Sequence, residues 1–144
     1  MQQHGWLYRG VVGAALSALI LLAAACGGFG LWDTVECTPD WYGLTITPPP
    51  GATILEERCR SAFNPDFWLV FSVPASALEA FQAATPITDW TSDASGLLNF
   101  QAEAARATSV LAGRFGNGAI SVEALVDMSD AELYTVYYKA TFVD

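Results

Sequence analysis

The strongest constraint on the fold is a run of fifteen residues without a charged side chain, residues 11–25, near the start of the chain. A short polar segment with one certain positive charge, Arg9, precedes this run. A positive segment, an apolar stretch of this length and small residues at its end are the parts of a secretory signal peptide. A membrane-spanning helix needs about 20 apolar residues, and three glycines just after the run would weaken a longer helix. We therefore predict a signal peptide over residues 1–25, which leaves 119 of the 144 residues for one modest core.

Cys26 follows this run, with Ala24-Ala25 before it and Gly27-Gly28 after it. The stretch resembles the lipobox of bacterial lipoprotein precursors, in which small residues precede an invariant cysteine and a leucine usually stands three places upstream. Ala23 occupies that upstream place here, and Leu22 lies one position earlier. The resemblance implies that Cys26 is diacylated and becomes the new N-terminus. Two acyl chains would anchor the exported domain stably to the cell membrane or outer membrane.

Two other fates of the leader fit the same residues. The sequence Ala23-Ala24-Ala25 also has the small-x-small pattern of ordinary signal peptidase sites, which would give a plainly secreted protein. An uncleaved leader would instead remain as a membrane anchor. In each case the domain after residue 26 lies outside the cytoplasm.

The three cysteines are divided by this interpretation into one lipid carrier and one pair. If Cys26 carries lipid, Cys37 and Cys59 remain, and an oxidising compartment allows them to form a disulfide. Such a bridge would stabilise the fold by about 3 kcal/mol on the chain-entropy estimate. The alternative is two buried free cysteines.

The charge balance excludes one large class of function. From residue 26 onward the chain has five basic and fifteen acidic residues, a formal charge of −10. A basic groove for a nucleic-acid backbone is therefore not expected. An acidic surface suits solubility, repulsion from anionic lipid or a basic partner, and a solvated surface is the plainest of these interpretations.

Alternating apolar and polar residues predict two β-hairpins, one from residues 53–62 and 67–73 and one from residues 119–126 and 133–143. In the first strand Ile54, Glu56, Arg58 and Arg60 are expected on one face. A capping-box pattern from Ser76 to Glu79 predicts a short helix that ends near residue 84. Helical spacing predicts a second helix over residues 97–112, with Gly113 as its C-terminal cap.

This order of elements predicts an α+β fold, with a small antiparallel sheet of about four strands and one or two helices packed on one face. The expected organisation is a signal peptide (1–25), a lipidated tether and lead-in segment (26–41) and a single α+β domain (42–144). The pattern of a Pro-Pro segment, a charged strand, a second strand ending in proline and a capped helix resembles small envelope lipoproteins. No activity comes with that resemblance.

The catalytic groupings that the sequence allows are few. His4 is the only histidine and lies in the leader, so Ser-His-Asp or Cys-His catalysis and histidine metal ligation are excluded from the domain. No cofactor and no metal site is predicted. Asp127, Asp130 and Glu132 can bind calcium weakly, although a solvated turn is the simpler explanation. A carboxylate hydrolase would need two of the following to converge: Glu56, Asp66, Asp89, Asp93, Asp127 and Glu132.

We therefore predict a non-enzymatic, membrane-anchored binding or accessory module of the cell envelope. Its partner is an envelope protein or a cell-wall ligand, with no nucleic acid, and the sequence indicates no oligomeric state. Trp41 and Trp90 are candidates for a partner surface, while the alternative is that each covers the edge of the core. The other hypotheses are a carboxylate-based hydrolase acting on an envelope polymer and an inhibitor or immunity-type lipoprotein.

Overall fold

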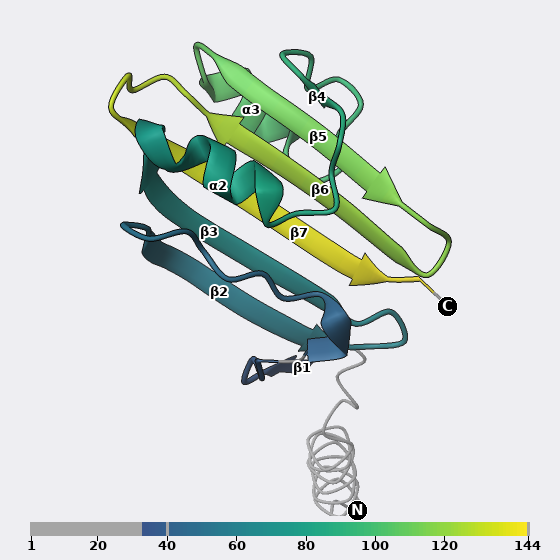
Figure 1. The fold of residues 1–144 in the computed structure, drawn as a ribbon. Coiled ribbons are helices and arrows are strands. Elements are labelled where there is room, and N and C mark those ends of the chain that lie inside the picture. The colour runs from purple at the N-terminus through teal and green to yellow at the C-terminus, as the bar shows by residue number, and fades with distance from the viewer. Residues whose placement is uncertain (1–32, 40, 144) are drawn as a thin grey trace, which may run out of the picture. The chain divides into compact units, whose positions relative to one another are not determined.

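The computed structural model describes residues 33–39 and 41–143, and within them seven strands form one antiparallel sheet. Across the sheet the strands follow the order β1-β2-β3-β7-β6-β5-β4 (Figure 1). The strands are β1 (Asp33–Val35), β2 (Thr53–Ser61), β3 (Asp66–Pro74), β4 (Trp90–Thr91), β5 (Val110–Gly116), β6 (Ile120–Asp127) and β7 (Leu133–Phe142). The helices are η1 (Trp41–Gly43), η2 (Ala75–Ala77), α2 (Leu78–Ala83) and α3 (Gln101–Arg106). The predicted signal peptide and Cys26 lie outside the described residues.

The predicted α+β fold, with about four strands and helices on one face, is wrong. The described chain is closer to all-β, because the sheet has seven strands and the helices are short. The two α-helices also cover opposite faces, with α2 in front of the sheet in Figure 1 and α3 behind it. We call these faces the α2 face and the α3 face. Among the described residues, no helix has both the length and the apolar character needed to cross a bilayer.

The error in fold class arises in residues 97–112, where alanines at helical spacing predict one long helix. Only α3 forms there, and the chain then continues as strand β5. Leu111 packs on the buried cluster of the α2 face, whereas Ala112 belongs to the cluster of the α3 face. This period of two is the signature of a strand. Gly113 is therefore no helix cap, and it pairs with Trp90 of β4 instead.

Both predicted hairpins are confirmed, since β2 pairs with β3 and β6 pairs with β7. Strands β3 and β7 also pair, which joins the two hairpins at the centre of the sheet. The short helix α2 follows β3 as expected. Its N-cap residue is Ala77 and no side chain caps it, so the predicted capping box at Ser76 and Glu79 is wrong.

A β-bulge in β2 changes the expected division of its faces. Ile54 lies opposite Phe71, whereas Glu56 lies opposite Val70, so one extra residue separates them on β2. Because a bulge breaks the alternation of side chains, Ile54 is not on the face of Arg58 and Arg60. Beyond the bulge the expected alternation is regular.

Two clusters of buried hydrophobic residues pack on the sheet, one on each face. The larger one fills the α2 face and includes Phe67, Phe71, Phe81 and Tyr138. The smaller one fills part of the α3 face and consists of Leu97, Phe100, Ala112 and Leu125, with the partly buried Trp68 and Tyr137 packed against it. The α3 face is thus covered over β5 and β6 and more open over β2 and β3.

The predicted disulfide between Cys37 and Cys59 is present, with their Cα atoms 5.1 Å apart. Cys59 is fully buried in the α2-face cluster, on strand β2. Cys37 lies just after the short strand β1. The bridge therefore holds the segment after β1 against the edge of the sheet.

Candidate functional site, a cationic hollow on the α3 face

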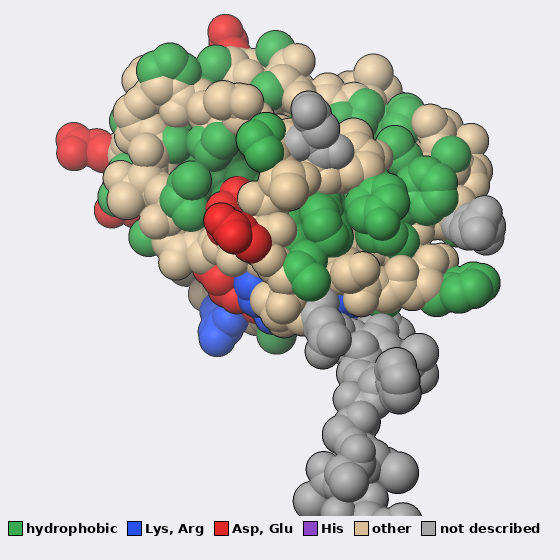
Figure 2. All heavy atoms as spheres, turned by 90° about the horizontal axis from the view of Figure 1, so that it is seen from below, with side chains coloured by type: hydrophobic (Ala, Val, Ile, Leu, Met, Phe, Trp, Pro, Cys, Tyr) green, Lys and Arg blue, Asp and Glu red, His purple; other side chains and the backbone are tan. Residues whose placement is uncertain are grey.

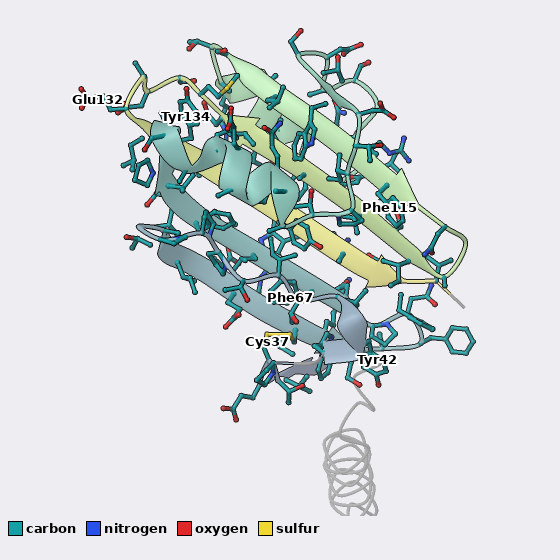
Figure 3. All side chains as sticks on the ribbon, viewed as in Figure 1. Cys37, Tyr42, Phe67, Phe115, Glu132 and Tyr134 are labelled. Carbon is teal, nitrogen blue, oxygen red and sulfur yellow. A yellow bond between two sulfur atoms is a disulfide. The ribbon has the colours of Figure 1, made fainter. Side chains whose placement is uncertain are left out.

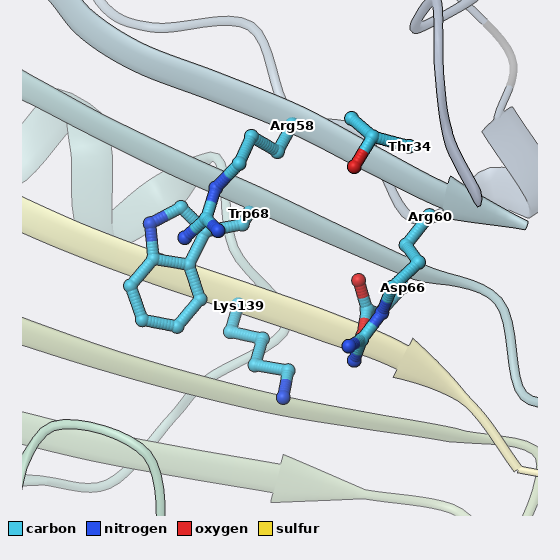
Figure 4. A pocket seen from close by; sticks show the side chains of 6 residues that line it. All are labelled: Thr34, Arg58, Arg60, Asp66, Trp68 and Lys139. Carbon is cyan, nitrogen blue, oxygen red and sulfur yellow. The ribbon is translucent and has the colours of Figure 1, made fainter. Parts of the chain in front are cut away.

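Two neighbouring cross-strand rows on the α3 face enclose a hollow of about 220 Å³. The first row contains Arg58 of β2, Trp68 of β3 and Lys139 of β7, each directly opposite the next. In the second row Arg60 of β2 lies opposite Asp66 of β3. Figure 4 shows the six residues that line the hollow, which are Thr34, Arg58, Arg60, Asp66, Trp68 and Lys139.

Trp68 forms the floor at the centre of the first row. Its ring packs against Phe100, with 4.9 Å between the ring centroids. The guanidinium carbon of Arg58 lies 5.1 Å from the centroid of the Trp68 ring, within the range of a cation–π contact. Arg58 Nε also lies 2.6 Å from Glu56 Oε1. Because both partners of this ion pair are about half exposed, it adds little to stability and serves mainly to orient Arg58.

The second row is fixed by the ion pair between Arg60 and Asp66. Arg60 donates to Asp66 Oδ2 through Nε, at 3.1 Å, and through its terminal nitrogen Nη2. Asp66 is largely buried, whereas Arg60 remains partly exposed. The pair closes the hollow beside the β2–β3 turn.

On the other side of Trp68, Lys139 is positioned by Asn99. Lys139 Nζ donates to Asn99 Oδ1 at 2.8 Å, and Asn99 Nδ2 donates to Glu123 Oε2 at 2.9 Å. The carboxylate of Glu123 also accepts the backbone N–H groups of Leu98 and Asn99 at 3.0–3.1 Å. Glu123 is only 3% exposed, so these bonds hold the loop at residues 98–99 against β6.

The hollow is cationic although the chain as a whole carries a net charge of −9. Three of the six basic residues line it, together with one acidic residue, Asp66. The hydrogen-bond partner of Lys139 is a neutral amide, which orients the ammonium group without neutralising its charge. Charge-assisted hydrogen bonds from guanidinium and ammonium groups are those that bind carboxylates and phosphates.

The two tryptophans predicted as a partner surface lie against the α2-face cluster and are partly buried. Trp41 packs edge-on against Tyr42, with ring centroids 5.2 Å apart. Trp90 packs against Phe81 at 5.8 Å, and its indole N–H donates to the carbonyl of Ile87. These contacts are those expected for residues at the edge of the core. A role in partner binding stays a prediction.

Two of the carboxylates considered for a hydrolase, Asp89 and Asp93, line a second hollow of about 200 Å³ beside Arg114. Hydrogen bonds from the backbone and the side chain of Ser95 hold the pKa of Asp93 below its usual range. A general acid at neutral pH needs a raised pKa. Asp93 is therefore suited to remain ionised and not to donate a proton.

The carboxylates considered for calcium instead shape the β6–β7 turn. Asp127 Oδ1 accepts the backbone N–H of Ser129 at 2.9 Å. Asp130 Oδ1 accepts the N–H groups of Glu132 and Leu133, and these bonds hold the pKa of Asp130 below its usual range. Within the described ranges, no three His, Cys, Asp or Glu side chains come together as a metal site.

The cationic hollow was missed in the sequence because its residues are distant in the chain. Arg58 and Trp68 belong to one predicted hairpin, and a turn at residues 62–65 is enough to place them opposite each other. Lys139 joins them only through the pairing of β3 with β7. No local pattern signals that pairing, and the acidic composition conceals the local excess of positive charge.

Comparisons with protein-family models, with curated proteins and with solved structures find no match to this chain. The geometry of the described residues and the motifs of the sequence therefore carry the functional proposal.

Proposed function

We propose that this chain is an exported lipoprotein whose sheet domain binds an anionic ligand of the cell envelope without converting it chemically. The observation that carries the proposal is the row in which Arg58 and Lys139 flank Trp68 beside an open hollow. Three basic groups converge there in a chain with few basic residues. Glu56 and Asp66 pair with Arg58 and Arg60, whereas the hydrogen bond of Lys139 is to the neutral amide of Asn99.

The chemistry of the hollow favours a carboxylate or phosphate group on a larger molecule. Arg58 supplies a planar donor group, and Lys139 supplies a point charge from the opposite side of Trp68. Trp68 offers apolar surface next to these charges, which suits a ligand with an uncharged part beside its anionic group. A free carboxylate or phosphate on a cell-wall polymer or an envelope protein meets both requirements.

The lipid anchor is supported by the leader and by the cysteines. The uncharged run before Cys26 and the small residues at its end fit a lipoprotein signal. The bridge between Cys37 and Cys59 fits an oxidising compartment outside the cytoplasm. It also leaves Cys26 as the cysteine without a disulfide partner in the sequence.

Anion binding is tested by titrating the full-length protein, purified in a neutral detergent, with inorganic phosphate and separately with acetate. The indole N–H signal of Trp68 is followed by NMR and assigned with a Trp68→Phe variant. We expect a saturable shift of this signal that weakens as sodium chloride is added, because binding through charges is screened by salt.

Two charge-removing variants make the test specific. Lys139→Gln should weaken phosphate binding several-fold, because the ammonium group faces the hollow. Arg106→Gln removes a positive charge from the exposed surface of α3 and should leave binding unchanged. Equal effects of the two variants, or a shift that never saturates, would refute a specific anion site.

The anchor is tested independently with labelled palmitate. The parent protein should incorporate the label, and a Cys26→Ser variant should not. Incorporation that persists in the variant would exclude Cys26 as the lipid carrier.

A further inference from the structure

One end of the sheet presents aromatic and aliphatic side chains to solvent. Phe63, in the β2–β3 turn, is 87% exposed, and Tyr42 and Val143 are 54% and 40% exposed. The backbone N–H of Phe142 donates to the carbonyl of Pro65, which brings the end of β7 to this turn. The ring of Tyr42 lies 6.2 Å from that of Phe142. We call the surface formed by Tyr42, Phe63, Phe142 and Val143 the apolar end.

The backbone holds Tyr42 at this surface in an unusual conformation. Tyr42 has φ 47° and ψ 22°, in the left-handed region that bulky residues rarely adopt. It is the one residue other than glycine with positive φ in the described part of the chain. Backbone strain of this kind persists where the surrounding structure imposes it, often at functional positions. Here its result is an aromatic ring kept at the surface and not in the core.

The two turns at the apolar end carry no charged residue, whereas the turn at the opposite end of the sheet carries several acidic ones. The turns at residues 62–65 and 116–120 contain no charged residue. The β6–β7 turn at the other end carries Asp127, Asp130 and Glu132. Figure 3 places Glu132 and Tyr42 at opposite ends of the sheet. In Figure 2, seen from the β1 side, the visible acidic side chains lie toward the left and centre, whereas hydrophobic side chains reach the surface on both sides of the view.

The chain also enters the sheet at the apolar end. Asp33, the first residue of β1, pairs with Ser61, two residues before Phe63. Seven residue steps separate Cys26 from Asp33, so an extended chain spans at most about 25 Å between them. The ten residues of β7 extend over about 30 Å to the opposite end. A lipid on Cys26 would therefore keep the apolar end nearer to the bilayer than the acidic end.

We propose that the apolar end rests on the surface of the bilayer that anchors Cys26, with Phe63 and Tyr42 at the level of the lipid head groups. This proposal rests on the lipid anchor proposed above. Aromatic side chains favour the interface between head groups and acyl chains. The opposite, acidic end then points away from anionic lipid, which would repel it. The strands run away from the bilayer, so the hollow on the α3 face stays open to solvent at the side of the domain.

Photo-crosslinking in the full-length, palmitate-labelled protein tests this orientation. Benzoylphenylalanine replaces Phe63, and the protein is reconstituted in vesicles of phosphatidylethanolamine and phosphatidylglycerol. The same substitution at Leu98 and at Leu133 provides two controls. Leu98 is 79% exposed but lies over the middle of β6, and Leu133 is 49% exposed at the acidic end. We expect at least five times more phospholipid adduct from position 63 than from either control.

The possible results distinguish failure of the proposed docking surface from failure of the proposed lipid anchor. Palmitate on Cys26 together with equal lipid adducts at positions 63, 98 and 133 would overturn the docking surface and leave the anchor intact. Adducts from position 63 to a second protein chain would overturn it as well, because they would place a protein on the apolar end. A parent protein without palmitate would overturn the anchor and, with it, the docking that depends on it.

Discussion

Gly113 in β5 lies directly opposite Trp90 in β4, and the indole ring occupies the space beside the glycine Cα. A Cβ atom added to Gly113 would lie 2.5 Å from Ile87 Cγ2 and 3.0 Å from Trp90 Cε3. Neither neighbour can move easily, because both pack on the α2-face cluster. We predict that Gly113→Ala lowers the free energy of unfolding by about 1–3 kcal/mol, as expected for overpacking. Urea denaturation of the two proteins measures this difference.

Gly116→Ala is the matched control for this substitution. Gly116 lies in the same strand, and the nearest atom to an added Cβ is the carbonyl oxygen of Ile120 at 3.9 Å. Alanine there should leave stability unchanged or raise it slightly, because it restricts the unfolded chain. If Gly113→Ala is as stable as Gly116→Ala, the prediction is wrong, because Ile87 and Trp90 then move aside at no cost in stability.

The same glycine explains why the fold class was predicted wrongly. A glycine after an alanine-rich segment is the usual sign of a helix end, whereas Gly113 is needed for the close approach of Trp90. The requirement becomes visible only when β4 is placed beside β5. The two hairpins could be predicted because each has its own alternation and a short turn, and both are local in sequence.

The candidate site was predictable to a smaller extent than the fold. Arg58 and Trp68 are paired by the β2–β3 turn, which the sequence indicates through residues 64–66. Lys139 and Glu123 reach the same row only through the pairing of β7 with its two neighbours. The alternation of β6 puts Glu123 on the face opposite Val122 and Ala124, and Glu123 is buried there because the loop at residues 97–100 covers it. A single sequence contains no local signal for the pairing of β7 with β3 and β6, or for the loop that covers Glu123.

Glu123 should contribute to stability through the loop that it holds. Glu123→Gln removes the negative charge that accepts the N–H groups of Leu98 and Asn99. Hydrogen bonds to a charged group contribute about 1.5–3 kcal/mol each, so we predict a loss of at least 1.5 kcal/mol in unfolding free energy. Amide hydrogen exchange at Leu98 and Asn99 should accelerate in the variant.

Glu103→Gln is the control for Glu123→Gln. It removes an ion pair within helix α3, in which Glu103 lies 3.5 Å from the largely exposed Arg106, and such helical pairs contribute about 0.3–0.5 kcal/mol. Equal effects of the two glutamine substitutions on stability would contradict an anchoring role for Glu123.

Reduction of the disulfide between Cys37 and Cys59 should destabilise the domain. The bridge joins residues 22 positions apart, and the chain-entropy estimate for such a loop is about 3 kcal/mol. Urea midpoints of the oxidised and the reduced protein measure the difference in unfolding free energy. Mass analysis without reductant should find Cys37 and Cys59 two hydrogens lighter than their thiol forms. Free thiols at both positions, or identical midpoints, would contradict the prediction.

Burial of Tyr138 should make the stability of the folded domain decrease at alkaline pH. Burial raises the pKa of the Tyr138 phenol, and its hydroxyl donates to the carbonyl of Leu44 at 3.4 Å. The unfolded chain ionises this phenol near pH 10, whereas the folded chain does not until a higher pH. Because the raised pKa belongs to the folded state, stability that is complete below about pH 10 is lost as pH rises above that value.

Tyr138→Phe removes this titration while keeping the ring in the core. We predict that unfolding free energy falls less between pH 9 and 11 in Tyr138→Phe than in the parent protein, although it starts slightly lower at pH 7. Tyr137, whose pKa burial also raises, is present in both proteins and so leaves the comparison unaffected. Urea unfolding at several pH values, with phenolate absorbance followed at each, gives the measurement. Parallel pH dependence in the two proteins would mean that Tyr138 ionises in the folded state as it does in water.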